Sequence, residues 1–98
     1  MRKIKLVPDK PFHNSCDIAI VDVTDDGPEK KRGKITAEYA EADVRQLQRQ
    51  GMDYEAAMAY FQDTIDAVIA HYIADEWECI QGCDQVMEII SDHVKRYY

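Results

Sequence analysis

Long apolar segments, glycine, proline and cysteine are all scarce in this chain of 98 residues, which has four glycines, three prolines and three cysteines. So little glycine and proline excludes collagen-like and low-complexity classes. No apolar run approaches the roughly 20 residues that a membrane-spanning helix needs. Pro8 and Pro11 interrupt the first apolar stretch, so we expect no secretory signal, a cytoplasmic protein and reduced thiols.

Catalytic sequence motifs are missing as well. The chain has no glycine-rich phosphate loop, no G-x-S-x-G elbow and no H-E-x-x-H helix. We therefore predict no enzyme, no catalytic residues and no cofactor. A zinc site could combine the spacings His13-x-x-Cys16 and Cys79-x-x-x-Cys83 into a Cys₃His set. The two halves lie in unrelated contexts, however, so buried structural thiols are the favoured interpretation and no metal is predicted.

Positive charge is absent from almost half of the chain. Residues 1–49 have ten Lys or Arg and nine Asp or Glu, a balance of +1, whereas residues 50–98 have two and ten, a balance of -8. No Lys or Arg occurs between Gln50 and Val94. Helix surfaces usually mix charges, because opposite charges four residues apart stabilise a helix. The acidic half is thus the least generic property of this sequence.

Two segments near the N-terminus have the pattern of β-strands. Residues 3–7 alternate polar and apolar side chains, which predicts a strand near a sheet edge. Residues 17–23 are rich in β-branched side chains and should form a better buried strand, paired antiparallel to the first. Lys34 and Ile35 would add a short third strand if residues 24–33 form a hairpin. The basic cluster Lys30–Lys34 is expected to be a solvated loop, so direct nucleic-acid binding is not predicted.

From residue 36 the apolar period changes to that of helices. The first predicted helix begins at a Thr36 cap, has Glu38 in its first turn and ends at Gly51. A central helix begins after Asp53 and ends at Gly82, and a third begins near Asp84. The apolar stripes of the three helices are Ala40, Val44 and Leu47; then Ala57, Phe61, Ile65, Val68 and Tyr72; then Val86, Ile90 and Val94.

These elements predict an α+β fold in one domain. Residues 1–35 should form a small antiparallel sheet of two strands, or three with the hairpin, and residues 36–98 three α-helices that pack against it. The central helix also has alanines opposite its stripe, which predicts cover on more than one side; they are Ala56, Ala59, Ala67, Ala70 and Ala74.

An aromatic residue among acids marks the candidate partner-binding site. Trp77 is expected on the same side of the central helix as Asp63 and Asp66, and aromatic anchors dominate many interfaces. An alternative is that Trp77 caps the core. The candidate partner-binding residues are Asp63, Asp66, Asp75, Glu76, Trp77 and Glu78.

The leading functional hypothesis is a small regulatory protein whose acidic helical half binds a basic protein, for example a nucleic-acid-binding protein. One form of this hypothesis is a nucleic-acid mimic of phage or mobile-element origin, with carboxylates where phosphates would lie. The small size and the negative charge of the chain suggest this form of the hypothesis, and no sequence motif supports it. The alternative is a non-catalytic homo-oligomeric or Cys/His metal-binding module, with a homodimer among its forms.

Overall fold

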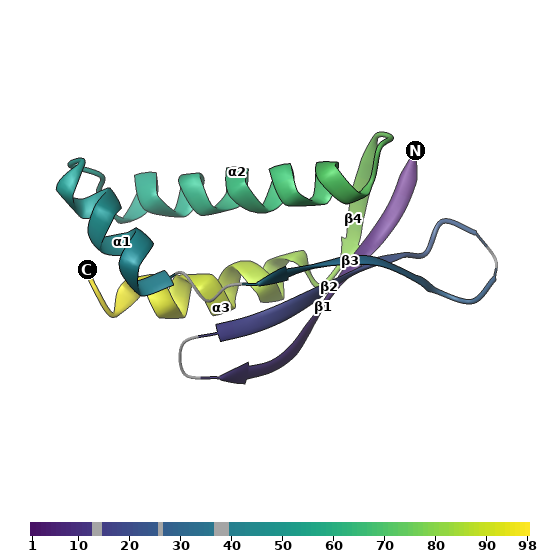
Figure 1. Ribbon diagram of the computed structural model, residues 1–98, viewed down its shortest axis with the longest axis horizontal. Coiled ribbons are helices and arrows are strands. Elements are labelled where there is room, and N and C mark those ends of the chain that lie inside the picture. The colour runs from purple at the N-terminus through teal and green to yellow at the C-terminus, as the bar shows by residue number, and fades with distance from the viewer. Residues whose placement is uncertain (13–14, 26, 37–39) are drawn as a thin grey trace.

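The computed structural model describes residues 1–12, 15–25, 27–36 and 40–98, and their side chains except those of residues 9–12, 15, 16 and 40–43. Three strands come first, followed by two helices, a fourth strand and a third helix (Figure 1). The elements are β1 (Arg2–Phe12), β2 (Ser15–Asp22), β3 (Lys30–Thr36), α1 (Ala40–Arg49), α2 (Tyr54–Tyr72), β4 (Trp77–Gln81) and α3 (Cys83–Lys95). The α+β class is therefore confirmed.

The sheet has four strands in the order β3-β2-β1-β4. The pairs β1–β2 and β2–β3 are antiparallel, whereas β1 and β4 are parallel. The prediction of a purely antiparallel sheet with two or three strands is thus wrong, although the third strand predicted at Lys34 and Ile35 exists and is longer. Because β4 pairs with β1, the segment predicted near an edge lies inside the sheet.

One face of the sheet forms part of the core. Ile4 and Leu6 of β1 and Ile18 and Ile20 of β2 are all buried, as the two-residue period of a strand requires. Lys3, which precedes Ile4, is exposed on the opposite face, and Lys5, between Ile4 and Leu6, is half-buried there. The prediction that residues 17–23 form a well-buried strand is confirmed.

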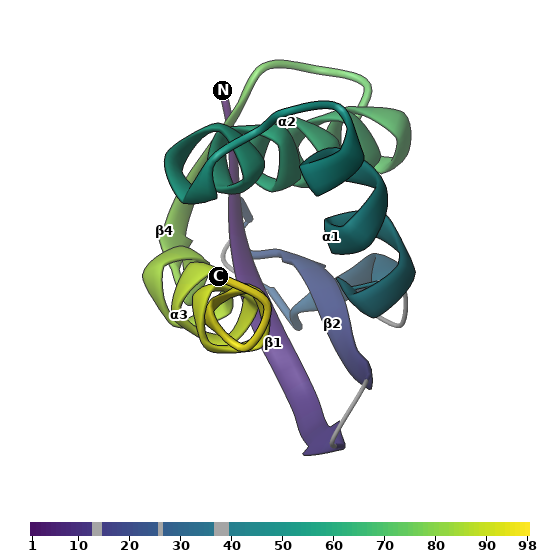
Figure 2. The ribbon, with the colours of Figure 1, turned by 90° about the vertical axis from the view of Figure 1, so that its left-hand side faces the viewer.

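The helices cover the apolar face of the sheet and complete a single core (Figure 2). Helices α2 and α3 lie side by side along the long axis of the molecule, and α1 packs against α3 at the end remote from β4 (Figure 1). No helix among the described residues has the length and apolar character to cross a membrane.

The joint before α2 forms as predicted. Gly51 has a φ of 83°, a left-handed conformation that glycine adopts without strain. The Asp53 side chain caps the helix by accepting a hydrogen bond from the Ala56 amide at 2.8 Å. The buried stripe then continues through Ala57, Phe61 and Ile65 as expected.

Beyond Ile65 the buried stripe of α2 differs from the prediction. Ile69 and Ile73 are buried, whereas Val68 is half-buried and Tyr72 is 42% exposed. The helix ends at Tyr72, with Ile73 as its extended C-cap residue, so the prediction of a helix up to Gly82 is wrong. The alanines opposite the stripe are exposed, so the predicted second cover is also wrong; they are Ala56, Ala59, Ala67, Ala70 and Ala74.

Two further helix boundaries differ from the sequence expectations. Thr36 is the last residue of β3 and its hydroxyl donates to Asp17 Oδ1 at 3.3 Å, so it does not cap α1, which begins at Ala40. The predicted role of Glu38 lies outside the described residues. Gly82, with a φ of 87°, is the N-cap of α3 and joins this helix to a strand instead of another helix. The stripe Val86, Ile90 and Val94 is buried as predicted.

Candidate functional site

Negative charge gathers on the elements that follow residue 50. Of the ten acids between Gln50 and Val94, nine are exposed and Asp66 is half-buried. Asp53 is the N-cap residue before α2, and the others lie on α2, on α3, on β4 and in the α2–β4 connection. We call these ten the acidic surface; its members are Asp53, Glu55, Asp63, Asp66, Asp75, Glu76, Glu78, Asp84, Glu88 and Asp92.

Most Lys and Arg residues lie on β1 and β3, and carboxylates of β2 and of the β2–β3 connection accompany several of them. Lys5 Nζ contacts Glu29 Oε1 at 2.6 Å, and Lys34 Nζ contacts Asp17 Oδ2 at 3.9 Å. The basic cluster Lys30–Lys34 is exposed to solvent as predicted, but it is part of β3, so the prediction of a loop there is wrong. The acids that follow residue 50 thus lie on other elements than most of the cations.

Two of the predicted partner-binding residues, Asp63 and Asp66, lie one turn apart on α2. Asp63 is exposed, whereas Asp66 is half-buried and accepts a hydrogen bond from Gln62 Nε2 at 2.9 Å. Asp66 thus faces the neighbouring β4–α3 region, and Asp63 faces water.

The other predicted acids follow the end of α2. Asp75 and Glu76 are exposed in the connection to β4, and Asp75 Oδ2 lies 3.9 Å from Arg2 Nε on β1. Glu78 is exposed on β4, and because side chains alternate along a strand it lies on the opposite face from Trp77. Glu78 is therefore displaced from the others of the predicted set.

Trp77 lies on a strand and not on the central helix, which corrects its expected position. It pairs with Arg2 across the β1–β4 ladder, and its half-buried side chain packs against the core. Trp77 and Asp66 nevertheless line one hollow of about 60 Å³ between α2 and the β4–α3 junction. The structure thus brings these two predicted residues together, and it also places Trp77 at the edge of the core.

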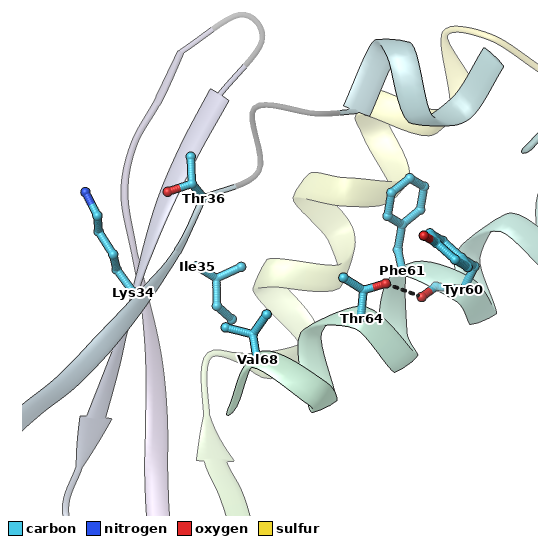
Figure 3. Close-up of a pocket in the computed structure, with 7 residues that line it drawn as sticks. All are labelled: Lys34, Ile35, Thr36, Tyr60, Phe61, Thr64 and Val68. Atoms are coloured by element: carbon cyan, nitrogen blue, oxygen red, sulfur yellow. Dashed lines mark hydrogen bonds between the residues drawn. The ribbon is translucent and has the colours of Figure 1, made fainter. Parts of the chain in front are cut away.

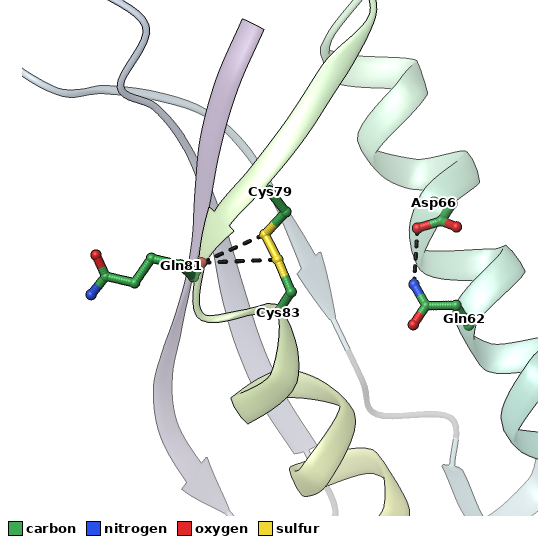
Figure 4. Close-up of a disulfide and its surroundings, with 5 residues drawn as sticks. All are labelled: Gln62, Asp66, Cys79, Gln81 and Cys83. Atoms are coloured by element: carbon green, nitrogen blue, oxygen red, sulfur yellow. Dashed lines mark hydrogen bonds between the residues drawn. A yellow bond between two sulfur atoms is a disulfide. The ribbon is translucent and has the colours of Figure 1, made fainter.

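The two cysteines of the β4–α3 junction line the same hollow. Cys79 and Cys83 form a disulfide with a Cα–Cα distance of 6.4 Å (Figure 4). The expectation of three reduced thiols is wrong for this pair, and sulfurs bonded to each other offer no thiolate to a zinc ion. His13 and the side chain of Cys16 lie outside the described parts of the chain. Within the described parts, no group of three or more His, Cys, Asp or Glu residues could hold a metal ion.

A buried carboxylate that sequence reasoning missed lies on β2. Asp22 is 6% exposed and accepts hydrogen bonds from the Thr24 hydroxyl at 2.6 Å and the Thr24 amide at 2.9 Å. Arg32 Nη2 lies 3.3 Å and Arg2 Nη1 3.6 Å from Asp22 Oδ2. The Thr24 hydrogen bonds, followed by Arg32 and Arg2, hold the pKa of Asp22 below its ordinary value despite burial.

This cluster gives the sheet and helical layers a charged connection. Arg2, Asp22 and Arg32 line a hollow of about 190 Å³ with Tyr72 and Asp75. Arg2 contacts Asp22 on the sheet as well as Asp75 of the acidic surface. Arg2 also lies 3.8 Å from Asp25 Oδ2, so the two arginines of the cluster face three carboxylates, and this network connects the sheet to the α2–β4 connection.

A larger hollow of about 260 Å³ lies between β3 and α2 (Figure 3). Ile35, Phe61 and Val68 supply apolar side chains, and Tyr60 is 43% exposed beside them. The Thr64 hydroxyl donates to the carbonyl oxygen of Tyr60 at 2.9 Å, so it is satisfied within the helix. Sequence reasoning could not identify this hollow, because it depends on how α2 is placed over the edge strand.

Comparison of the chain with protein-family models, with curated proteins and with solved structures gave no match.

Proposed function

We propose that this chain is a small protein-interaction module whose acidic surface binds a basic protein. The observation that supports the proposal most strongly is the run of 45 residues without Lys or Arg, in which nine of the ten acids are exposed. Most cations of the chain lie on other elements, so the acidic charge is left for an external partner. Such a surface accelerates encounter with an oppositely charged protein and favours that partner over acidic ones.

Trp77 is the proposed anchor of this surface. Its side chain is half-buried next to Asp66, and Asp75 and Glu76 immediately precede it in the chain. A large aromatic side chain held by the core orders few new rotamers on binding, which keeps the entropic cost of association low. Asp63, Asp66, Asp75 and Glu76 would supply carboxylates on the same side, and Glu78 would add to the negative charge from the opposite face of β4.

A narrower form of the proposal is mimicry of nucleic acid. Carboxylates on rigid helices would then occupy the phosphate sites of a nucleic-acid-binding protein, in keeping with a phage or mobile-element inhibitor that acts in the cytoplasm. Phosphate-binding proteins present clustered Lys and Arg, which the acidic surface would complement. Mimicry predicts that this chain and DNA or RNA compete for the same captured partner. A partner that binds both at once would instead recognise the acidic surface at a site separate from its nucleic-acid site.

The proposal is tested by affinity capture with matched charge variants. The immobilised chain is compared with an acid-neutralised variant, Asp63→Asn/Glu76→Gln, at about 0.05 M and about 0.3 M salt, where screening lengths differ about twofold. The matched control is Asp25→Asn/Glu29→Gln, which removes two exposed acids outside the acidic surface. Captured proteins are identified by mass spectrometry and their affinities are measured with purified material.

The proposal predicts a basic partner that the parent chain and the control retain at low salt. The acid-neutralised variant should lose it, and high salt should weaken it. If the retained proteins are neutral or acidic, or if both double variants retain them equally, the proposal is contradicted. Light scattering of the chain alone checks the alternative, because a stable homo-oligomer that covers α2 would leave this surface unavailable.

A further inference from the structure

The Cys79–Cys83 pair lies at a junction that the fold holds in place by other means. Cys79 is in β4, Cys83 is the first residue of α3, and Gly82 forms the turn between them (Figure 4). Cys79 pairs with Ile4 in the β1–β4 ladder, and the Val86 amide donates to the Gly82 carbonyl at 3.0 Å. The two sulfurs therefore stay close together whether or not a bond joins them.

A purely structural role accounts poorly for this disulfide. The bond closes a ring of only five residues, and the chain entropy that a disulfide removes from the unfolded state grows with ring length. The core already includes residues of β1 and α3, and Trp77 of β4 packs against it, so the junction is held without help from the bond. A short cross-link in a preformed junction changes its chemistry more than it changes its stability.

The surroundings also suit the reduced pair. The Gln81 carbonyl oxygen lies 3.5 Å from Cys79 Sγ and 3.9 Å from Cys83 Sγ, so it can accept from a thiol of either residue. Gly82 provides no side-chain cap for α3, which leaves amides of the first turn to stabilise a thiolate at Cys83. Both cysteines are half-buried and line the hollow beside Asp66 and Trp77.

We propose that Cys79 and Cys83 form a reversible dithiol–disulfide site that exchanges with small thiols of neutral or positive charge. The charge preference follows from the acidic surface: Glu78 and Asp84 are the sequence neighbours of the two cysteines, and both are exposed. An anionic thiolate or disulfide approaching this region is repelled, whereas a cationic one is attracted. This inference does not depend on the proposed binding of a basic protein.

The exchange balances without a further reactant. An external thiolate attacks Cys79 Sγ, the bond between the two protein sulfurs breaks, and its electron pair leaves on Cys83 Sγ next to the α3 N-terminus. A second external thiolate then attacks the external sulfur of the mixed disulfide and releases Cys79 as a thiolate. Two external thiols are thereby oxidised to one disulfide, and the protein disulfide is reduced to two thiols. The two protons of the external thiols end on Cys79 and Cys83.

The sequence itself allows a direct test on the full chain. Trypsin cannot cut between Gln50 and Val94, so Cys79 and Cys83 stay on one peptide that ends at Lys95 and is separate from Cys16. The folded chain is equilibrated with cysteamine and cystamine, or with reduced and oxidised glutathione, at a series of ratios. After acid quenching and alkylation, mass spectrometry counts the free thiols on this peptide, and circular dichroism monitors the fold.

The proposal predicts a reversible two-electron titration with the helical signal unchanged in both states. The rate of oxidation by cystamine is divided by the rate of oxidation by oxidised glutathione, for the folded chain and for the urea-unfolded chain. At low salt this ratio should be about tenfold larger for the folded chain, and added salt should bring the two ratios closer together. In Cys83→Ser the mixed disulfide at Cys79 should accumulate, whereas the parent chain should resolve it.

Four results would contradict the inference, the last of them through its charge preference. The pair could stay in one state at every ratio while the chain is folded, or change state only when urea unfolds the chain. Alternatively, reduction alone could abolish the helical signal, which would make the bond structural. Equal relative rates for cystamine and oxidised glutathione would refute the charge preference. Because the parent chain carries all of these measurements, misfolding of the Cys83→Ser variant leaves the test intact.

Discussion

Substitution of Gly82 by alanine tests the packing of the β4–α3 turn against β1. A Cβ atom at this position would overlap the carbonyl oxygen of Leu6 and would lie 3.0 Å from its carbonyl carbon, so the backbone of β1 or of the turn must move. The left-handed φ of 87° adds strain for any residue with a Cβ. Gly51 provides the matched control, since it has a φ of 83° and no atom within 4 Å of its added Cβ.

The two substitutions should differ by the steric contribution alone. We expect Gly51→Ala to lower the free energy of unfolding by about 1 kcal/mol, which is the left-handed strain less the loss of unfolded-chain entropy. Gly82→Ala adds an overpacking cost of about 1–3 kcal/mol, because it displaces a strand whose Leu6 side chain is buried. Its total of about 3 kcal/mol would be a large part of the roughly 5–15 kcal/mol typical of a domain.

Urea unfolding followed by circular dichroism measures both effects. With a slope of about 1–3 kcal/mol per molar urea, the additional 1–3 kcal/mol should lower the midpoint of Gly82→Ala by about 1 M relative to Gly51→Ala. Equal midpoints for the two variants would refute the reasoning, because they would mean that the turn does not press against β1.

Three further substitutions test other parts of the fold, each by urea unfolding. Asp22→Asn should lower the free energy of unfolding by about 1–3 kcal/mol at neutral pH, because the Asp22 carboxylate accepts hydrogen bonds from Thr24 and lies beside two arginines. Folding lowers the pKa of Asp22, so the stability that its carboxylate contributes is complete above the ordinary pKa of 3.8 and is lost as pH falls through the folded-state pKa. A difference in unfolding free energy between variant and parent that stays constant down to acid pH would contradict this prediction. Ile69→Ala should lower the free energy of unfolding by about 2–5 kcal/mol and Val68→Ala by about 1 kcal/mol, because Ile69 is 1% exposed and Val68 is only half-buried. Similar losses of stability in the two variants would mean that Val68 belongs to the buried stripe, as the sequence suggested. Asp53→Ala should cost about 1 kcal/mol through the lost cap of α2, and an unchanged midpoint would show that this cap is not formed.

Local sequence signals predicted the elements that depend on local interactions. The glycine and aspartate at Gly51 and Asp53 end one helix and cap the next, and the structure uses both in that way. The β-branched run of β2 and the stripe of α3 also predicted buried faces correctly. In each case the period of the side chains and the terminal residues carry the information within the element itself.

The missed element, β4, depends on interactions that are distant in sequence. Four of its five residues pair with β1, more than seventy positions earlier, and no periodic signal in the segment reveals a partner that far away. In sequence the segment alternates only over Trp77, Glu78 and Cys79, because the exposed Ile80 is apolar, so its strand signal is weak. It was outweighed by the apparent continuation of the helix up to Gly82, and the same error placed Trp77 on a helix.

The candidate site was predictable in composition but not in arrangement. Charge counts alone identified the acidic surface, because Lys and Arg are absent from residues 50–94. The contact of Asp66 and Trp77 with one hollow, and the disulfide beside them, required the position of β4 next to α2. Asp22 escaped notice because only the folded chain brings Thr24, Arg32 and Arg2 around it.

The association rate constant with the captured basic partner is the most direct test of the acidic surface as a binding site. It is measured by stopped-flow fluorescence over a range of salt concentrations for the parent chain, Asp63→Asn/Glu76→Gln and Asp25→Asn/Glu29→Gln. We predict a rate constant for the parent chain and the control that falls steeply with salt, and a lower, flatter dependence for the acid-neutralised variant. Identical salt dependences for all three chains would contradict the central claim.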